Sequence, residues 1–231
     1  MWQVLRNELH PKGLEIVTVA LDVGGQEAAG PWIELAKPEH PSLIDEAHLL
    51  DELLGIVNVP TGVWIDEDGT IVRPPEPAFP GKAVIAELGL PAGAPKRIVE
   101  MLTEAAKMKI QPERYAAALR DWVEHGSESR FALSPEEVVE RSRPSSPEVS
   151  QAAASFELAQ TLERSGHSED AVRWFREAHR LQPDNWTYKR QAWELVDPIL
   201  QGPSEQYEGD WLSDVRAAGP ENYYPVSPDL D

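Results

Sequence analysis

The 231-residue chain contains no cysteine. This absence excludes disulfides, thiolate metal ligands and cysteine nucleophiles from the residues present, because each of them needs a thiol. It does not distinguish an oxidising from a reducing compartment, since a chain without thiols is compatible with both.

Basic residues are scarce as well: 21 Lys and Arg stand against 40 Asp and Glu, which gives a formal net charge of -19. Such an acidic chain repels nucleic-acid phosphates and anionic lipid headgroups, so neither nucleic acid nor a membrane is expected as a partner. The longest apolar run, at 14–21, is far shorter than a membrane span. No export signal opens the chain, which predicts a cytoplasmic location unless a signal lies upstream of Met1.

The first ninety residues alternate short β-branched runs with helical spacing, which predicts an α/β unit. The nearly continuous apolar run at 14–22 is typical of a central strand buried on both faces. Helices are predicted over 27–37 and 46–54, with an edge strand between them at 40–45. The turn at 67–69 joins strands at 63–66 and 70–73 into a hairpin, and the proline-rich stretch at 74–80 is expected to end the sheet.

The remainder of the chain has helical periodicity, with proline-initiated helices predicted over 95–109 and 112–124. Residues 143–147 predict a linker, and the acidic tail is expected to be irregular, over the surface or partly disordered. The predicted units are an α/β domain at 1–90, a helical extension at 91–143, a helix pair at 148–200 and an irregular tail at 201–231.

A repeat-like spacing marks residues 152–185. The pattern-bearing positions are Leu158, Ala159, Leu162, Gly166, Ala171, Phe175, Ala178, Pro183 and Asn185. The three alanines allow close helix approach, the leucines and Phe175 fill the gaps, and a third helix over 186–196 covers the pair. The segment resembles one tetratricopeptide repeat, which implies a protein partner. Such arrays need about three repeats, so a structural appendage is favoured over a peptide-binding groove.

Three blocks in the first ninety residues carry a second resemblance: residues 12–22, KGLEIVTVALD; residues 54–61, LGIVNVPT; and residues 63–72, VWIDEDGTIV. Their order and spacing resemble the central strand, the "YGV-x-x-(V/T)-P-T" segment and the "F-x-I-D-x-x-G-x-I" hairpin of thioredoxin-like proteins of the TlpA/ResA and peroxiredoxin-related type. The resemblance implies an N-terminally incomplete thioredoxin-like fold that needs no cofactor.

The same resemblance implies three site residues. Pro60 would follow a cis peptide bond and leave the Val59 backbone free to pair with an extended disulfide substrate, while Trp2 would pack beneath the redox site. An ordinary trans proline is the alternative. Residues 1–9 correspond to the later turns of the family's redox helix, so we expect the first strand and the Cys or Sec nucleophile to lie upstream of Met1. Trp2 would be the last tryptophan of a Trp-Ala-x-x-Sec-Gly-x-x-x-Trp motif.

No other group of residues in the sequence indicates a catalytic or metal-binding site. His40 and His48 lie near acidic residues, but a solvated polar loop explains them better than a metal site does. The sequence therefore predicts part of a thioredoxin-like thiol-disulfide or peroxide oxidoreductase, an antioxidant and candidate selenoprotein in its complete form, that is inert as given. The alternative is a redox-dead interaction module that binds a protein partner through its helices.

Overall fold

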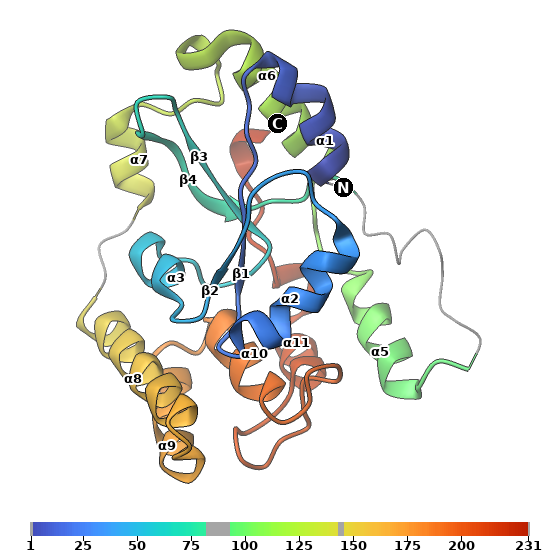
Figure 1. The fold of residues 1–231 in the computed structure, drawn as a ribbon, viewed down its shortest axis with the longest axis vertical. Helices are drawn as coiled ribbons and strands as arrows, with labels where there is room; N and C mark the ends of the chain where they lie inside the picture. The colour runs from blue at the N-terminus through green and yellow to red at the C-terminus, as the bar shows by residue number, and fades with distance from the viewer. Residues whose placement is uncertain (1, 82–92, 143–145, 231) are drawn as a thin grey trace.

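The computed structural model describes residues 2–81, 93–142 and 146–230, and shows a mixed α/β protein (Figure 1). Residues 143–145 of the predicted linker, and the predicted boundary at residue 90, lie outside this part of the chain. The bounds of the first half are α1 Trp2–Leu9, β1 Thr18–Leu21, α2 Gly25–Ala36, β2 Ser42–Asp45, α3 Leu49–Leu54, β3 Thr61–Ile65 and β4 Ile71–Pro77. Those of the second half are α5 Lys96–Ala105, α6 Pro112–His125, α7 Pro135–Arg141, α8 Pro147–Arg164, α9 Ser168–Leu181, α10 Trp186–Glu194 and α11 Trp211–Ala218.

The described residues form two separate two-stranded sheets. β1 pairs with β2 in parallel, with Thr18 opposite Ser42, and β3 pairs with β4 as an antiparallel hairpin. These pairings confirm the predicted edge strand and the predicted hairpin. The sheet ends within the proline-rich stretch at 74–80, but at Pro77, four residues beyond the predicted end of the strand at Arg73. Proline lacks a backbone donor, and β4 tolerates it because, among the residues that the structure describes, only β3 pairs with β4.

The strand expected to be central and fully buried is neither. β1 spans four residues, all of them partly exposed, because the sheet has no strand on its other side in the described part of the chain. Only three apolar residues between positions 10 and 60 are buried: Ile16, Val23 and Ala29. This region is therefore thinly packed compared with the rest of the molecule.

One hydrophobic core joins α1, the hairpin and α6. Leu5 and Leu9 from α1 meet Trp64 from β3, Tyr115 and Leu119 from α6, and the near-terminal Leu230. The predicted division between a unit at 1–90 and an extension at 91–143 is therefore not a packing boundary, because α6 completes the core of α1 and the hairpin. Figure 1 accordingly shows the two termini close together.

The second core is formed by α8–α11. α8 and α9 pack as a helical hairpin, with Ala159, Ala171, Phe175 and Ala178 fully buried between them, and α10 covers them. Leu158, expected to fill a gap, is instead 39% exposed. The helix pair and the third helix are as predicted, whereas their tetratricopeptide character stays a proposal.

The tail at 201–231 is not irregular. It contains α11, and its aromatic residues are buried in the second core: Tyr207, Trp211, Tyr223 and Tyr224. The prediction failed because the tail has little periodicity of its own, and its order comes from aromatic side chains that pack on distant helices.

Candidate functional site

The loop between α3 and β3 holds two of the three predicted site residues. The Val59–Pro60 peptide bond is cis, as the sequence predicted. The carbonyl of Pro60 accepts a hydrogen bond from the amide of Ala78 at 3.1 Å, which ties the loop to the end of β4.

The backbone of Val59 is not free, contrary to the sequence prediction. Its amide donates to the side-chain oxygen of Asn58 at 2.9 Å, and its carbonyl accepts from the Tyr224 hydroxyl at 2.9 Å. The side chains of Asn58 and Tyr224, neither of which the sequence indicated as a site residue, therefore satisfy both polar groups. A substrate strand would have to displace them.

Segments far apart in the sequence converge on this loop. The Asn58 amide donates to the carbonyl of Tyr223 at 3.1 Å, and the amide at the start of α10, on Trp186, donates to the carbonyl of Val57 at 2.7 Å. The ring of Phe79 meets that of Tyr224 edge-on at 4.9 Å. The loop is thus a junction between the two cores, and no short-range sequence signal predicts it.

Trp2 lies on α1 and reaches the hairpin through Tyr115. The two rings meet edge-on at 6.1 Å, and the Tyr115 hydroxyl accepts from the Trp64 indole at 3.0 Å. The pKa of Tyr115 is raised by burial, so its hydroxyl stays protonated and serves packing. The ring contact of Trp2 therefore ties it to α6 and not to the Val59–Pro60 loop, and its place in one site with Val59 and Pro60 stays a prediction.

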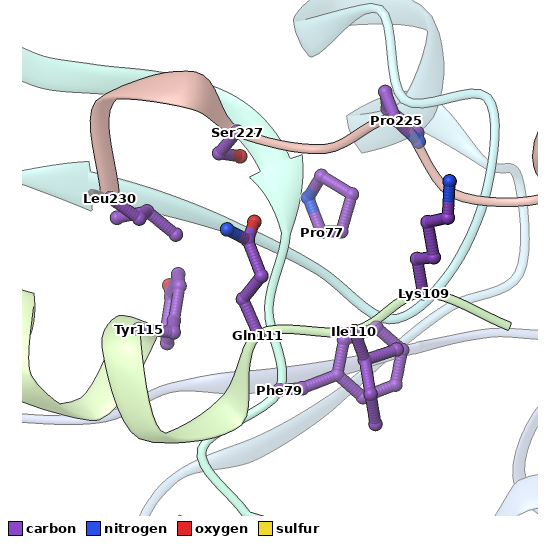
Figure 2. Close-up of a pocket in the computed structure, with 9 residues that line it drawn as sticks. All are labelled: Pro77, Phe79, Lys109, Ile110, Gln111, Tyr115, Pro225, Ser227 and Leu230. Atoms are coloured by element: carbon purple, nitrogen blue, oxygen red, sulfur yellow. The ribbon is translucent and has the colours of Figure 1, made fainter.

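A narrow pocket lies beside Tyr115, between the end of β4, the start of α6 and the C-terminal residues. Figure 2 shows Gln111 and Ser227 over one side of it and Phe79 and Ile110 at the other. Its volume of about 10 Å³ holds no more than one water molecule. It therefore cannot serve as a substrate site.

Two titratable groups at α3 are buried, which the sequence analysis missed. His48, expected in a solvated loop, is 2% exposed and lies 2.9 Å from the Gln160 amide through Nδ1. Burial lowers the pKa of His48 to about 4 and raises the pKa of Asp51 to about 8. Both groups are therefore predominantly neutral at pH 7. The helical spacing of the leucines at 49–54 indicated a helix, but could not show that α8 covers its first turn.

Within residues 2–81, 93–142 and 146–230, no group of three or more His, Asp or Glu side chains is placed to hold a metal ion. In the same ranges, no helix combines the length and the apolar character needed to cross a membrane.

Comparison with family models, with curated proteins and with solved structures finds no match to this chain. The thioredoxin-like resemblance therefore rests on the three sequence blocks alone, and what it implies for function is a proposal.

Proposed function

We propose that this chain is the frame of a thioredoxin-like thiol-disulfide or peroxide oxidoreductase whose Cys or Sec nucleophile lies on a segment upstream of Met1. Residues 1–231 alone are inert in that chemistry, because they contain no thiol. The substrate class is a protein or peptide disulfide, or a peroxide. The observation that carries the proposal is the open edge of β1.

The hydrogen-bond pattern of β1 defines that edge. The amide of Thr18 donates to the carbonyl of Pro41, on the β2 side, at 3.0 Å. Because backbone groups alternate along a strand, the amides of Val19 and Leu21 point away from β2. Among the described residues, neither amide has a backbone partner outside the β1–β2 pair. One further strand beside β1 would satisfy both amides.

The exposed apolar side chains of β1 and its surroundings also indicate that a further segment packs here. β1 has the apolar sequence of a strand buried on both faces, yet each of its residues is partly exposed. Nine of the fifteen strongly exposed large apolar side chains that the structure describes lie in residues 4–65. A strand and the first turns of a helix added beside β1 would cover apolar surface that is now exposed to water.

Such a segment would supply the missing chemistry. A thiolate or selenolate at the start of a helix is stabilised by the helix dipole, which lowers its pKa and makes it reactive at neutral pH. It would attack one sulfur of a substrate disulfide and release the other as a thiolate. In this proposal, Val59 and Pro60 position the substrate, after the Tyr224 hydroxyl leaves the Val59 carbonyl, and Trp2 packs beneath the nucleophile.

The test begins with the DNA upstream of Met1, which should encode an in-frame Trp-Ala segment with a Cys or UGA codon. The extended protein should reduce insulin disulfides with dithiothreitol as electron donor, and its Cys-to-Ser or Sec-to-Ser variant should not. The chain of residues 1–231 is the inactive control. Equal rates in the extended protein and its Ser variant, or the absence of a Cys or Sec codon, would refute the proposal.

A redox-dead interaction module is the second candidate, favoured by the paired Val59 backbone. In that case the helices α8–α10 bind a protein partner, and the α/β part is a scaffold. The upstream sequence separates the two functions, since only the first requires Cys or Sec. A cytoplasmic location belongs to either proposal and is tested by cell fractionation.

A further inference from the structure

A second, larger cavity lies between α1, α2 and the starts of β1 and β2, with a volume of about 350 Å³. It is distinct from the pocket in Figure 2 and from the Val59–Pro60 loop. Small-molecule sites usually fall between about 300 and 1,000 Å³, so this cavity admits one compact ligand.

The walls of the cavity are aromatic and apolar. Trp2 from α1 lines one part, and Trp32, Ile33 and Ala36 from α2 line another. Trp32 is 71% exposed, which is unusual for so large an apolar side chain, and leaves its ring available at the rim. Two indoles in one small cavity favour a flat aromatic ligand, because such rings stack on or meet each other edge-on.

The floor of the cavity is polar and carries a connected hydrogen-bond network. The Thr18 hydroxyl lies 2.9 Å from the Ser42 hydroxyl and 3.3 Å from Nε2 of His40. Thr18 and Ser42 are opposite each other across the β1–β2 pair, so the sheet fixes this geometry. A serine hydroxyl has two acceptor lone pairs, and at least one on Ser42 remains available whichever way the network is oriented. The floor can therefore accept a hydrogen bond from a ligand.

The charges around the cavity favour a neutral ligand. None of the residues that line it is Asp, Glu or Arg, and burial lowers the pKa of His40, which keeps the imidazole neutral at pH 7. The Glu39 carboxylate lies beside it, held 2.9 Å from the amide nitrogen of Gln3, and would repel an anion. Arg6, a nearby cation, is already paired with Glu15 at 2.8 Å.

We propose that this cavity binds a neutral, flat aromatic molecule that carries one hydrogen-bond donor, of the size of an indole. The donor meets Ser42, and the ring lies between Trp2 and Trp32. This site needs no thiol, so binding can be measured with residues 1–231, although Trp2 also belongs to the proposed redox site.

The test is isothermal titration calorimetry of residues 1–231 with indole, and with 1-methylindole as the matched ligand that lacks the N–H. We expect indole to bind with a dissociation constant of about 1 mM or tighter, and 1-methylindole several-fold more weakly. Trp32→Ala should weaken indole binding about tenfold, and Ser42→Ala should remove the preference for indole over 1-methylindole.

Trp174→Ala is the control variant, since Trp174 lies on α9 and does not line this cavity. It should bind indole as the unchanged protein does. Because Trp32 is largely exposed, its replacement should leave the far-UV circular dichroism spectrum unchanged, so loss of binding cannot be attributed to unfolding. Absence of saturable indole binding, or equal binding by the Trp32→Ala and unchanged proteins, would overturn the proposal.

Discussion

At the scale of single residues, Asp51 is a buried carboxyl group with one oxygen that lacks a hydrogen-bond partner among the described residues. Its side chain is 3% exposed, and the oxygen without a partner there is Oδ2. Burial raises its pKa from an ordinary 3.8 to about 8. Between these values the folded state keeps a proton that the unfolded state has released. Stability therefore falls as the pH rises through this window.

Asp51→Asn removes this penalty while keeping the shape of the side chain. We expect the free energy of unfolding at pH 7 to rise by about 2 to 4 kcal/mol, with a much smaller effect at pH 4. Urea unfolding of both proteins at several pH values measures the difference, and Glu52→Gln at the exposed neighbour should change little. A destabilised Asp51→Asn protein at pH 7 would show that the ionised carboxylate is satisfied in the native state.

The atoms around Gly62 leave no space for a side chain at this position. A Cβ at this position would lie 2.5 Å from the Tyr115 hydroxyl and 2.9 Å from the Cβ of Ala78. Gly62→Ala should therefore reduce the free energy of unfolding by about 1 to 3 kcal/mol. Gly30→Ala in α2 is the matched control, because it meets only the end of the flexible Gln26 side chain. It should be neutral or slightly stabilising. Equal effects of the two substitutions in thermal unfolding would contradict this packing.

At the scale of elements, the sequence correctly predicts those helices and turns that are specified by residues close together in the chain. The leucine spacing before Gly55, the turn at Glu67–Gly69 and the alanines of α8 and α9 each specify their local structure, and each prediction is confirmed. Elements stabilised by distant partners were missed. α11 forms in a tail without periodicity, because burial of Trp211, Leu212 and Val215 in a core of remote aromatic residues outweighs local preference. The extension of β4 through its prolines was likewise not expected.

In the candidate site, too, the local structure could be predicted and the long-range contacts could not. The sequence predicted the cis Val59–Pro60 bond from the blocks on either side of it. It could not predict that Tyr224, 165 positions further along the chain, would donate to the Val59 carbonyl. Contacts at such separation depend on the whole fold, and a local pattern carries no information about them.

Asp210 is the residue that fixes the start of α11. Its Oδ1 atom accepts from the amides of Leu212 and Ser213 and from Arg97, at 2.9, 3.1 and 2.7 Å. Asp210→Ala should lower the free energy of unfolding by about 2 to 3 kcal/mol, because it removes a helix cap and a charge-assisted hydrogen bond together. Ser134→Ala, which removes the exposed cap of α7, should cost about 1 kcal/mol or less. Chemical denaturation measures both. Equal losses of unfolding free energy in the two variants would mean that the hydrogen bond from Arg97 to Asp210 contributes nothing to stability.

At the scale of the whole molecule, the two cores share the C-terminal tail. Tyr207, Trp211 and Tyr223 belong to the core of α8–α11, whereas Leu230 belongs to the core of α1, the hairpin and α6. The tail therefore joins two cores that the sequence divides into separate units. Its removal should affect both of them.

A chain that ends at residue 200 should lose cooperative unfolding and bind the dye ANS, because it leaves two aromatic surfaces exposed. A chain that ends at residue 225 keeps Tyr223 and Tyr224, and should stay folded, with a loss of roughly 2 to 4 kcal/mol from the missing Leu230 side chain. Calorimetry of the chains that end at residues 200, 225 and 231 tests this predicted order of stability. A fully stable chain of 200 residues would refute the structural role of the tail.

A strand bearing the redox nucleophile is proposed to pair with the open edge of β1. Amide hydrogen exchange of residues 1–231, followed by NMR, tests it most directly. Thr18 and Ala20, whose amides face β2, should be protected at least about tenfold more than Val19 and Leu21, whose amides face outward. Equal protection of all four amides would show that the edge is already covered, and would rule out the proposed pairing of an upstream strand.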